Sequence, residues 1–137
     1  MGSANTFVLV APDCPVEEGI VPASRSGTQT VAELQYQLLS QHPYRYTLED
    51  LILEVHLQRL GLSASERATC EAAIRAELFS KPQACMRASP LPKSYGFGVH
   101  YDSQGRLAIF SKGSTEYQHL ASSPELRIVK AMRSRRA

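Results

Sequence analysis

The hydrophobic positions of this chain follow two different spacings, and the spacing changes beyond its middle. Between residues 31 and 79, apolar residues recur three and four positions apart, so they share one face of a helix. From residue 97 to residue 110 they alternate with polar or small residues, as in a half-buried strand. A short β-branched and aromatic run, Thr6–Val10, indicates a further strand. This order of elements predicts an α+β fold.

Three helices are expected in the first part of the chain, each after a hydroxyl residue that has an acid three positions later. Such a capping box pairs backbone N–H groups that the start of a helix otherwise leaves unpaired. The boxes begin at Thr30, Thr47 and Ser63. The apolar spacing predicts helices over residues 31–41, 48–60 and 64–79. Gly61 is expected to be the left-handed cap of the second helix.

A β-hairpin is expected in the second part, with its turn at residues 102–105. In its first strand, Gly98 and His100 share one face because side chains alternate along a strand. A short helix is expected over residues 114–122. Residues 126–132 fit either a helix or a strand by their spacing. We expect a strand, because a lone hairpin is marginally stable and gains from another strand.

Composition indicates one domain. The chain has 137 residues, of which 43% are hydrophobic and 20% charged, close to globular averages. A domain of this size buries roughly two-thirds of the surface that its unfolded chain exposes. We expect a single compact α+β domain over residues 1–137, with flexible ends at about 1–4 and 134–137. Its small antiparallel sheet, with the hairpin at the centre, is expected to pack against three helices.

Targeting and redox features indicate a soluble, cytoplasmic protein. No apolar run approaches the ~20 residues that span a bilayer, and residues 1–5 do not resemble a secretory signal. The three cysteines, Cys14, Cys70 and Cys85, form no CxxC pair, so neither a zinc ribbon nor a redox dithiol is indicated. Cys70 lies on the apolar stripe of the third helix and is expected in the core. We expect reduced thiols, no membrane association, no metal and no cofactor; a homo-oligomer is left open.

Charge is distributed unevenly along the chain. Residues 1–80 contain five arginines and ten carboxylates, a net charge of −5. Residues 81–137 contain ten lysines and arginines and three carboxylates, a net charge of +7. Such asymmetry can mark an anionic partner, or it can reflect two faces of one fold that attract each other.

Four stretches of the chain carry a resemblance to a known family. They are residues 5–7 with 11–15, residues 40–47, residues 87–93 with 95–100, and residues 130–136. Together they resemble a family of small uncharacterised proteins, a domain of unknown function found in bacteria and some fungi. The third stretch is the most specific. The resemblance implies no activity and supplies no catalytic residue.

The segment from Cys85 to His100 holds the residues that we expect to form a binding site. Its prolines are expected to stiffen a loop, which lowers the entropy lost on binding. Arg87 can hold a phosphate or carboxylate through two parallel hydrogen bonds, and Lys93 adds a compact charge. With Tyr95 and His100 they form a predicted anion pocket. Alternatively, the prolines and glycines only shape a connection and the two basic side chains are solvated.

Other residues support one competing hypothesis and one extension of the anion-binding hypothesis. Cys85 with His100 or His42 as base would make a thiol-dependent enzyme, which needs a base within hydrogen-bond reach of the thiol. A basic C-terminal stretch would hold nucleic acid through its phosphates. Its candidate residues are Lys130, Arg133, Arg135 and Arg136.

The common catalytic and nucleotide-binding fingerprints, GxGxxG, GxxxxGK[ST], HExxH and GxSxG, are missing from this sequence. The charge asymmetry and the proline-stiffened basic segment support the preferred hypothesis, a non-enzymatic binding module for an anionic ligand, either a phosphorylated metabolite or nucleic acid. A thiol-dependent enzyme using Cys85 and a protein-interaction subunit remain as alternatives.

Overall fold

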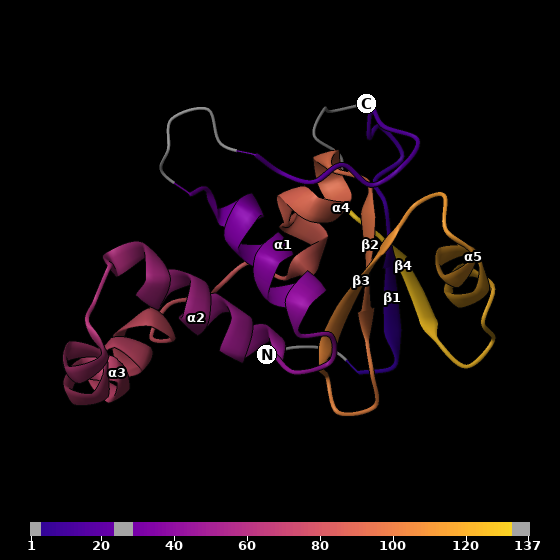
Figure 1. Cartoon of the computed structure of the whole chain (residues 1–137). Coiled ribbons are helices and arrows are strands. Elements are labelled where there is room, and N and C mark those ends of the chain that lie inside the picture. The colour runs from indigo at the N-terminus through magenta and orange to yellow at the C-terminus, as the bar shows by residue number, and fades with distance from the viewer. Residues whose placement is uncertain (1–3, 24–28, 133–137) are drawn as a thin grey trace.

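The computed structural model describes residues 4–23 and 29–132, and its elements follow the predicted order (Figure 1). The strands are β1 (Thr6–Leu9), β2 (Phe97–Tyr101), β3 (Leu107–Ser111) and β4 (Arg127–Lys130). The helices are α1 (Val31–Gln41), α2 (Leu48–Leu60), α3 (Ala64–Leu78), α4 (Pro90–Ser94) and α5 (Thr115–Ala121), with a 3-10 turn, η1 (Met86–Ala88). Apart from Ala4, the ends expected to be flexible lie outside the described residues.

The capping boxes form as predicted. Thr30, Thr47 and Ser63 each accept a hydrogen bond from the backbone N–H three residues later, and the acid at that position reaches back. Gly61 ends α2 in the left-handed conformation, with φ of 67°. Local chemistry therefore determines where these three helices begin.

The four strands form one mixed sheet in the order β3-β2-β1-β4. The β1–β2 and β2–β3 pairs are antiparallel, and β1–β4 is parallel, with Thr6 opposite Arg127. The α+β class is confirmed, but the sheet is not purely antiparallel and the hairpin does not occupy its centre. A parallel neighbour requires a crossover, and the chain makes it from β3 through α5 to β4.

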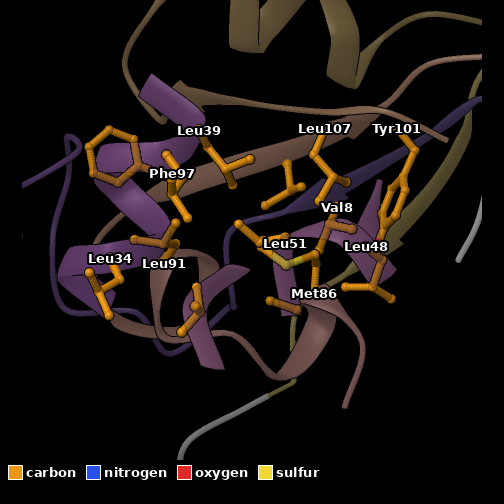
Figure 2. Packing of buried hydrophobic residues seen from close by; sticks show 14 of the residues in the cluster. Val8, Leu34, Leu39, Leu48, Leu51, Met86, Leu91, Phe97, Tyr101 and Leu107 are labelled. Atoms are coloured by element: carbon orange, nitrogen blue, oxygen red, sulfur yellow. The ribbon is translucent and has the colours of Figure 1, made fainter. Parts of the chain in front are cut away.

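Helices cover both faces of this sheet. Helices α1, α2 and α4 lie on one side and α5 on the other (Figure 1). On the first side, Val8, Leu39 and Leu51 belong to the main hydrophobic cluster, and Leu39 and Leu51 are fully buried (Figure 2). On the second side, the rings of Phe7 and Tyr117 meet edge to face with centroids 5.1 Å apart.

Gly98 is required by this second, smaller cluster. A Cβ atom on Gly98 would lie 2.6 Å from a carbon of the Phe7 ring and 2.6 Å from one of the Tyr117 ring. The glycine therefore lets both rings approach the sheet. The Tyr117 hydroxyl accepts a hydrogen bond of 2.9 Å from the Val10 backbone N–H.

Helix α3 differs from the sequence-based expectation. None of its residues is buried, and Cys70, expected in the core, is exposed. The larger apolar side chains, Ile74 and Leu78, line a groove beside α2 and are only partly buried. Most other apolar positions of α3 are alanines. Their small side chains provide helical spacing but little apolar area to bury, so α3 does not reach the sheet (Figure 1).

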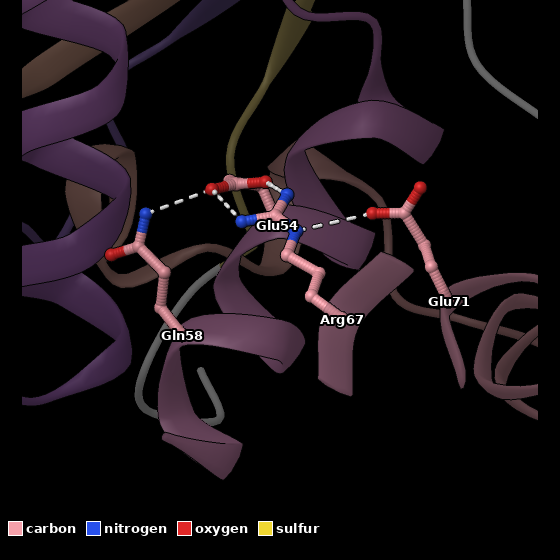
Figure 3. Close-up of polar contacts among 4 residues, drawn as sticks. All are labelled: Glu54, Gln58, Arg67 and Glu71. Carbon is pink, nitrogen blue, oxygen red and sulfur yellow. Dashed lines mark hydrogen bonds and ion pairs between the residues drawn. The ribbon is translucent and has the colours of Figure 1, made fainter. Parts of the chain in front are cut away.

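Ion pairs connect α3 to α2 instead. The Arg67 guanidinium pairs with both carboxylate oxygens of Glu54 and, at 3.1 Å, with Glu71 (Figure 3). The Gln58 amide also donates to Glu54, at 3.0 Å. Burial alone would raise the pKa of Glu54, but the hydrogen bonds from Arg67 and Gln58 hold it below its usual value.

The segment expected to be a stiffened loop contains η1 and α4. The Ser89 side chain accepts from the Leu91 N–H at 3.2 Å, and Pro90 is the first residue of α4. Proline fits this position because its fixed φ is helical and the missing N–H would be unpaired there anyway. The prolines thus begin a helix that packs on β2 rather than stiffening an open loop.

In the described part of the chain, no helix is long and apolar enough to cross a membrane. The same residues contain no cluster of three or more His, Cys, Asp or Glu side chains that could hold a metal ion.

Candidate anion-binding site

The structure separates the four residues predicted to form one anion pocket. His100 lies on β2 and shares the face of Gly98, which contacts Phe7 and Tyr117. His100 therefore lies on the α5 side of the sheet. Arg87, in η1, lies on the opposite side with Val8 and Tyr101. One ligand group cannot contact His100 and Arg87 together across the sheet.

Lys93 and Tyr95 lie at the other end of α4 from Arg87. Tyr95 caps α4, packs against the main cluster, and its backbone carbonyl accepts from the Ile20 N–H at 2.8 Å. Lys93 is half-buried in the last turn of α4, and its side chain makes no hydrogen bond to a described residue. Of the predicted set, Arg87 alone borders the hollow described next.

Arg87 lies beside the C-terminal end of β4, where it makes two hydrogen bonds. Its Nε donates to the Lys130 carbonyl at 2.8 Å, and its own carbonyl accepts from the Met132 N–H at 2.8 Å. This arrangement imitates a short strand beside β4. It also orients the guanidinium and leaves Nη1 and Nη2 without hydrogen-bond partners among the described residues.

Beside Arg87 is a hollow of about 120 Å³, which we call the η1–β4 hollow. Its lining residues are Thr6, Val8, Cys85, Arg87, Tyr101, Arg127 and Val129. The parallel register explains this set: Thr6 is opposite Arg127 and Val8 opposite Val129, so these four side chains share a face. Residues from β1, near the start of the chain, and from β4, near its end, therefore meet η1 at this hollow.

The charge of the η1–β4 hollow is positive. Arg87 and Arg127 are both exposed, and neither forms an ion pair with a described residue. No carboxylate lines the hollow in the described part of the chain. Burial raises the pKa of Tyr101 to about 12, so its hydroxyl stays protonated and neutral at ordinary pH.

Sequence reasoning did not place Arg127 at the same hollow as Arg87. Arg127 was visible only as part of the basic C-terminal stretch, and nothing local to it indicates that it pairs with Thr6. Among the proposed nucleic-acid ligands, Lys130 is exposed on β4. The other three, Arg133, Arg135 and Arg136, lie outside the described residues.

Cys85 is exposed at the η1–β4 hollow and forms no hydrogen bond to His100 or His42. His100 faces the other side of the sheet, where its Nδ1 is 2.8 Å from the Tyr44 hydroxyl. His42 follows α1, with its ring centroid 6.1 Å from that of Tyr46. Neither predicted base therefore forms a hydrogen bond with the Cys85 thiol.

Fold and site together define a small α+β protein with a positively charged hollow at one sheet edge. The chain belongs to the family described as DUF6157, a family of unknown function, whose model matches residues 1–137. This confirms the resemblance to a domain of unknown function. No curated protein and no solved structure matches the chain.

Proposed function

We propose that this protein is a non-enzymatic binding module that holds a phosphoryl group of a small metabolite in the η1–β4 hollow. The observation that carries the proposal is that two arginines, Arg87 and Arg127, line the hollow, whereas its described lining includes no carboxylate. Two like charges left together without a counter-ion are unfavourable. An anion between them would relieve that repulsion.

The fixed geometry of Arg87 supports the proposal. Its Nε donates to the Lys130 carbonyl at 2.8 Å, so one edge of the guanidinium is anchored before a ligand arrives. The two remaining nitrogens present the fork that matches a phosphate or carboxylate. Such preorganisation reduces the entropy lost on binding.

The size of the η1–β4 hollow favours a single phosphoryl group. Its volume of about 120 Å³ is well below the roughly 300–1,000 Å³ of pockets that enclose a whole small-molecule ligand. The rest of a phosphorylated metabolite would lie outside it. Nucleic acid is less suited, because the aromatic ring in the lining, Tyr101, is only 2% exposed and offers no face for stacking a base.

The competing function, a thiol-dependent enzyme using Cys85, is less supported than binding. A nucleophilic thiol requires a base within hydrogen-bond reach, and Cys85 makes no hydrogen bond to a histidine.

The proposal is tested by a thermal-shift titration with inorganic phosphate, phosphoethanolamine, glucose 6-phosphate and a short single-stranded DNA. A ligand at ~100 times its dissociation constant adds about 2.7 kcal/mol of stability. For a domain of this size we expect a shift of several degrees with a phosphorylated small molecule. Arg127→Gln should weaken that binding by about tenfold or more, since it removes a charge-assisted contact worth roughly 1.5–3 kcal/mol.

The matched control is Arg45→Gln, which removes the same charge from an exposed position in the α1–α2 connection. Equal weakening in Arg45→Gln and Arg127→Gln would mean that only net charge matters, which contradicts a site in the hollow. A larger shift with DNA than with the phosphorylated metabolites would favour nucleic acid as the ligand. No shift with any probe would reject the binding module.

A further inference from the structure

A second depression lies on the α5 side of the sheet, away from the η1–β4 hollow. It has a volume of about 370 Å³, and we call it the α5 groove. Its lining residues are Tyr44, Phe110, Thr115, Glu116, His119 and Leu120. Phe110 comes from β3, Tyr44 from the connection between α1 and α2, and the others from α5. Phe110 is opposite Gly98, which places it on the face that α5 covers.

The Tyr44 wall of the α5 groove is held in place by its backbone. Tyr44 has φ of 60°, a left-handed conformation that is uncommon outside glycine. Its N–H donates to the Leu107 carbonyl at 2.8 Å, and the Leu107 N–H donates to the Tyr46 carbonyl at 2.8 Å. These bonds attach the connection to the edge of β3. Strained residues persist where the surrounding structure holds them, and they are frequent at functional sites.

The Tyr44 side chain is held as well. Its hydroxyl is 2.8 Å from His100 Nδ1, and the two rings lie edge to face with centroids 5.6 Å apart. Burial lowers the pKa of His100, so its ring is neutral at pH 7 and its Nδ1 can accept a hydrogen bond from the Tyr44 hydroxyl. The aromatic wall is therefore preorganised.

The α5 groove offers aromatic side chains and an acidic residue. The rings of Tyr44, Phe110 and His119 line it together with the acidic residue Glu116, and its described lining includes no lysine or arginine. Asp102 is close enough to influence the pKa values of both Tyr44 and His100. Aromatic faces attract cations through their quadrupoles. The groove thus has the opposite charge preference to the η1–β4 hollow.

We propose that the α5 groove binds a methylated organic ammonium group. A primary ammonium carries three N–H donors that need acceptors, and a lining rich in aromatic and aliphatic carbon supplies few. A quaternary ammonium has no N–H to satisfy, so ring faces and one carboxylate suffice for it. This binding is independent of the anion binding proposed above, because the two sites lie on opposite faces of the sheet.

The test is a titration of the full chain with choline, followed by ¹H–¹⁵N NMR. We expect saturable shifts at Tyr44, Phe110 and Leu120. The key comparison is 3,3-dimethyl-1-butanol, which has the shape of choline with a neutral carbon in place of nitrogen. Loss of the cation–π and carboxylate attraction should make it bind about tenfold or more weakly. Equal binding of both molecules, or the absence of saturable shifts, would overturn the proposal.

Two variants locate the binding. Glu116→Gln should weaken choline binding severalfold, and because Glu116 is exposed the fold should tolerate the change. The control is Glu125→Gln, also exposed but in the turn before β4, which should bind choline like the wild type. Phe110→Leu keeps apolar volume but removes a ring face, so it should weaken choline more than the neutral analogue. Unchanged choline affinity in Glu116→Gln would refute the assignment of the site.

Discussion

At the scale of single residues, His100 is an ionisable group that the fold brings into a partly buried position. Its Nδ1 is 2.8 Å from the Tyr44 hydroxyl. Burial lowers the pKa of His100, and the charge of Asp102 opposes this effect. Protonating His100 in the folded protein therefore costs more than in the unfolded chain.

This difference predicts a loss of stability in mild acid. Unfolded histidine titrates near pH 6.5, whereas folded His100 takes up its proton only at lower pH. Below about pH 6.5 the unfolded state binds more protons, so the free energy of unfolding decreases as pH falls. His100→Gln should lessen this decrease, as measured by Tm between about pH 7 and pH 5. An unchanged dependence of Tm on pH in His100→Gln would contradict this assignment.

The position of His100 also shows where sequence reasoning stopped. Strand alternation correctly placed Gly98 and His100 on one face of β2. It could not show on which side of the sheet Arg87 would return, because that depends on how η1 and α4 pack. A strand pattern gives relative orientation within the strand, and the packing of other elements decides what each face meets.

At the scale of elements, polar contacts between side chains hold α3 against α2. The Arg67–Glu54 pair, supported by Gln58 and Glu71, joins the two helices (Figure 3). A second pair, Arg75 with Glu49, is 3.2 Å long. Since α3 buries no residue, these pairs matter more for its position than for the stability of the protein.

Arg67→Ala should therefore loosen α3 without unfolding the molecule. We expect faster amide hydrogen exchange throughout α3 and a loss of global stability of about 1 kcal/mol or less. Arg59→Ala, an exposed arginine at the end of α2, serves as the control and should leave exchange in α3 unchanged. If Arg67→Ala slowed or did not alter that exchange, the ion pairs would not be what positions α3.

The elements differ in how well sequence predicted them. Capping boxes set the starts of α1, α2 and α3 because they are local hydrogen bonds. What α3 packs against could not be read from its spacing, which was helical but made largely of alanine. Helix α4 was missed because it has only five residues, too few for a periodic pattern.

At the scale of the whole molecule, the main cluster joins the helical layer to the sheet. Leu51 of α2 is fully buried in it (Figure 2). Leu51→Ala should reduce the free energy of unfolding by about 2–5 kcal/mol, because it removes transfer energy and leaves a cavity. Denaturant unfolding measures this loss.

The comparison for Leu51 is Leu60, on the same helix but 49% exposed. Leu60→Ala should change the free energy of unfolding by about 0.5 kcal/mol or less. Similar losses for the two variants would argue against a contribution of Leu51 to the main cluster that depends on its burial.

Long-range pairing was the part that sequence could not specify. The parallel register of Thr6 with Arg127 brings together residues from opposite ends of the chain. No local signal encodes that register, and the η1–β4 hollow depends on it. The strand at residues 127–130 was nevertheless expected, because a hairpin needs another strand to be stable.

The central position of β1 has a consequence for synthesis of the protein. Of the four described strands, β1 is translated first, yet both of its neighbours, β2 and β4, are translated much later. At ~5–20 residues per second, the ~120 residues between β1 and the end of β4 take roughly 6–24 s. Helices form within microseconds, so the nascent chain would carry helices beside an unpaired Phe7–Val8 segment. During those seconds, chaperones that hold unfolded chains would be able to bind this exposed apolar segment.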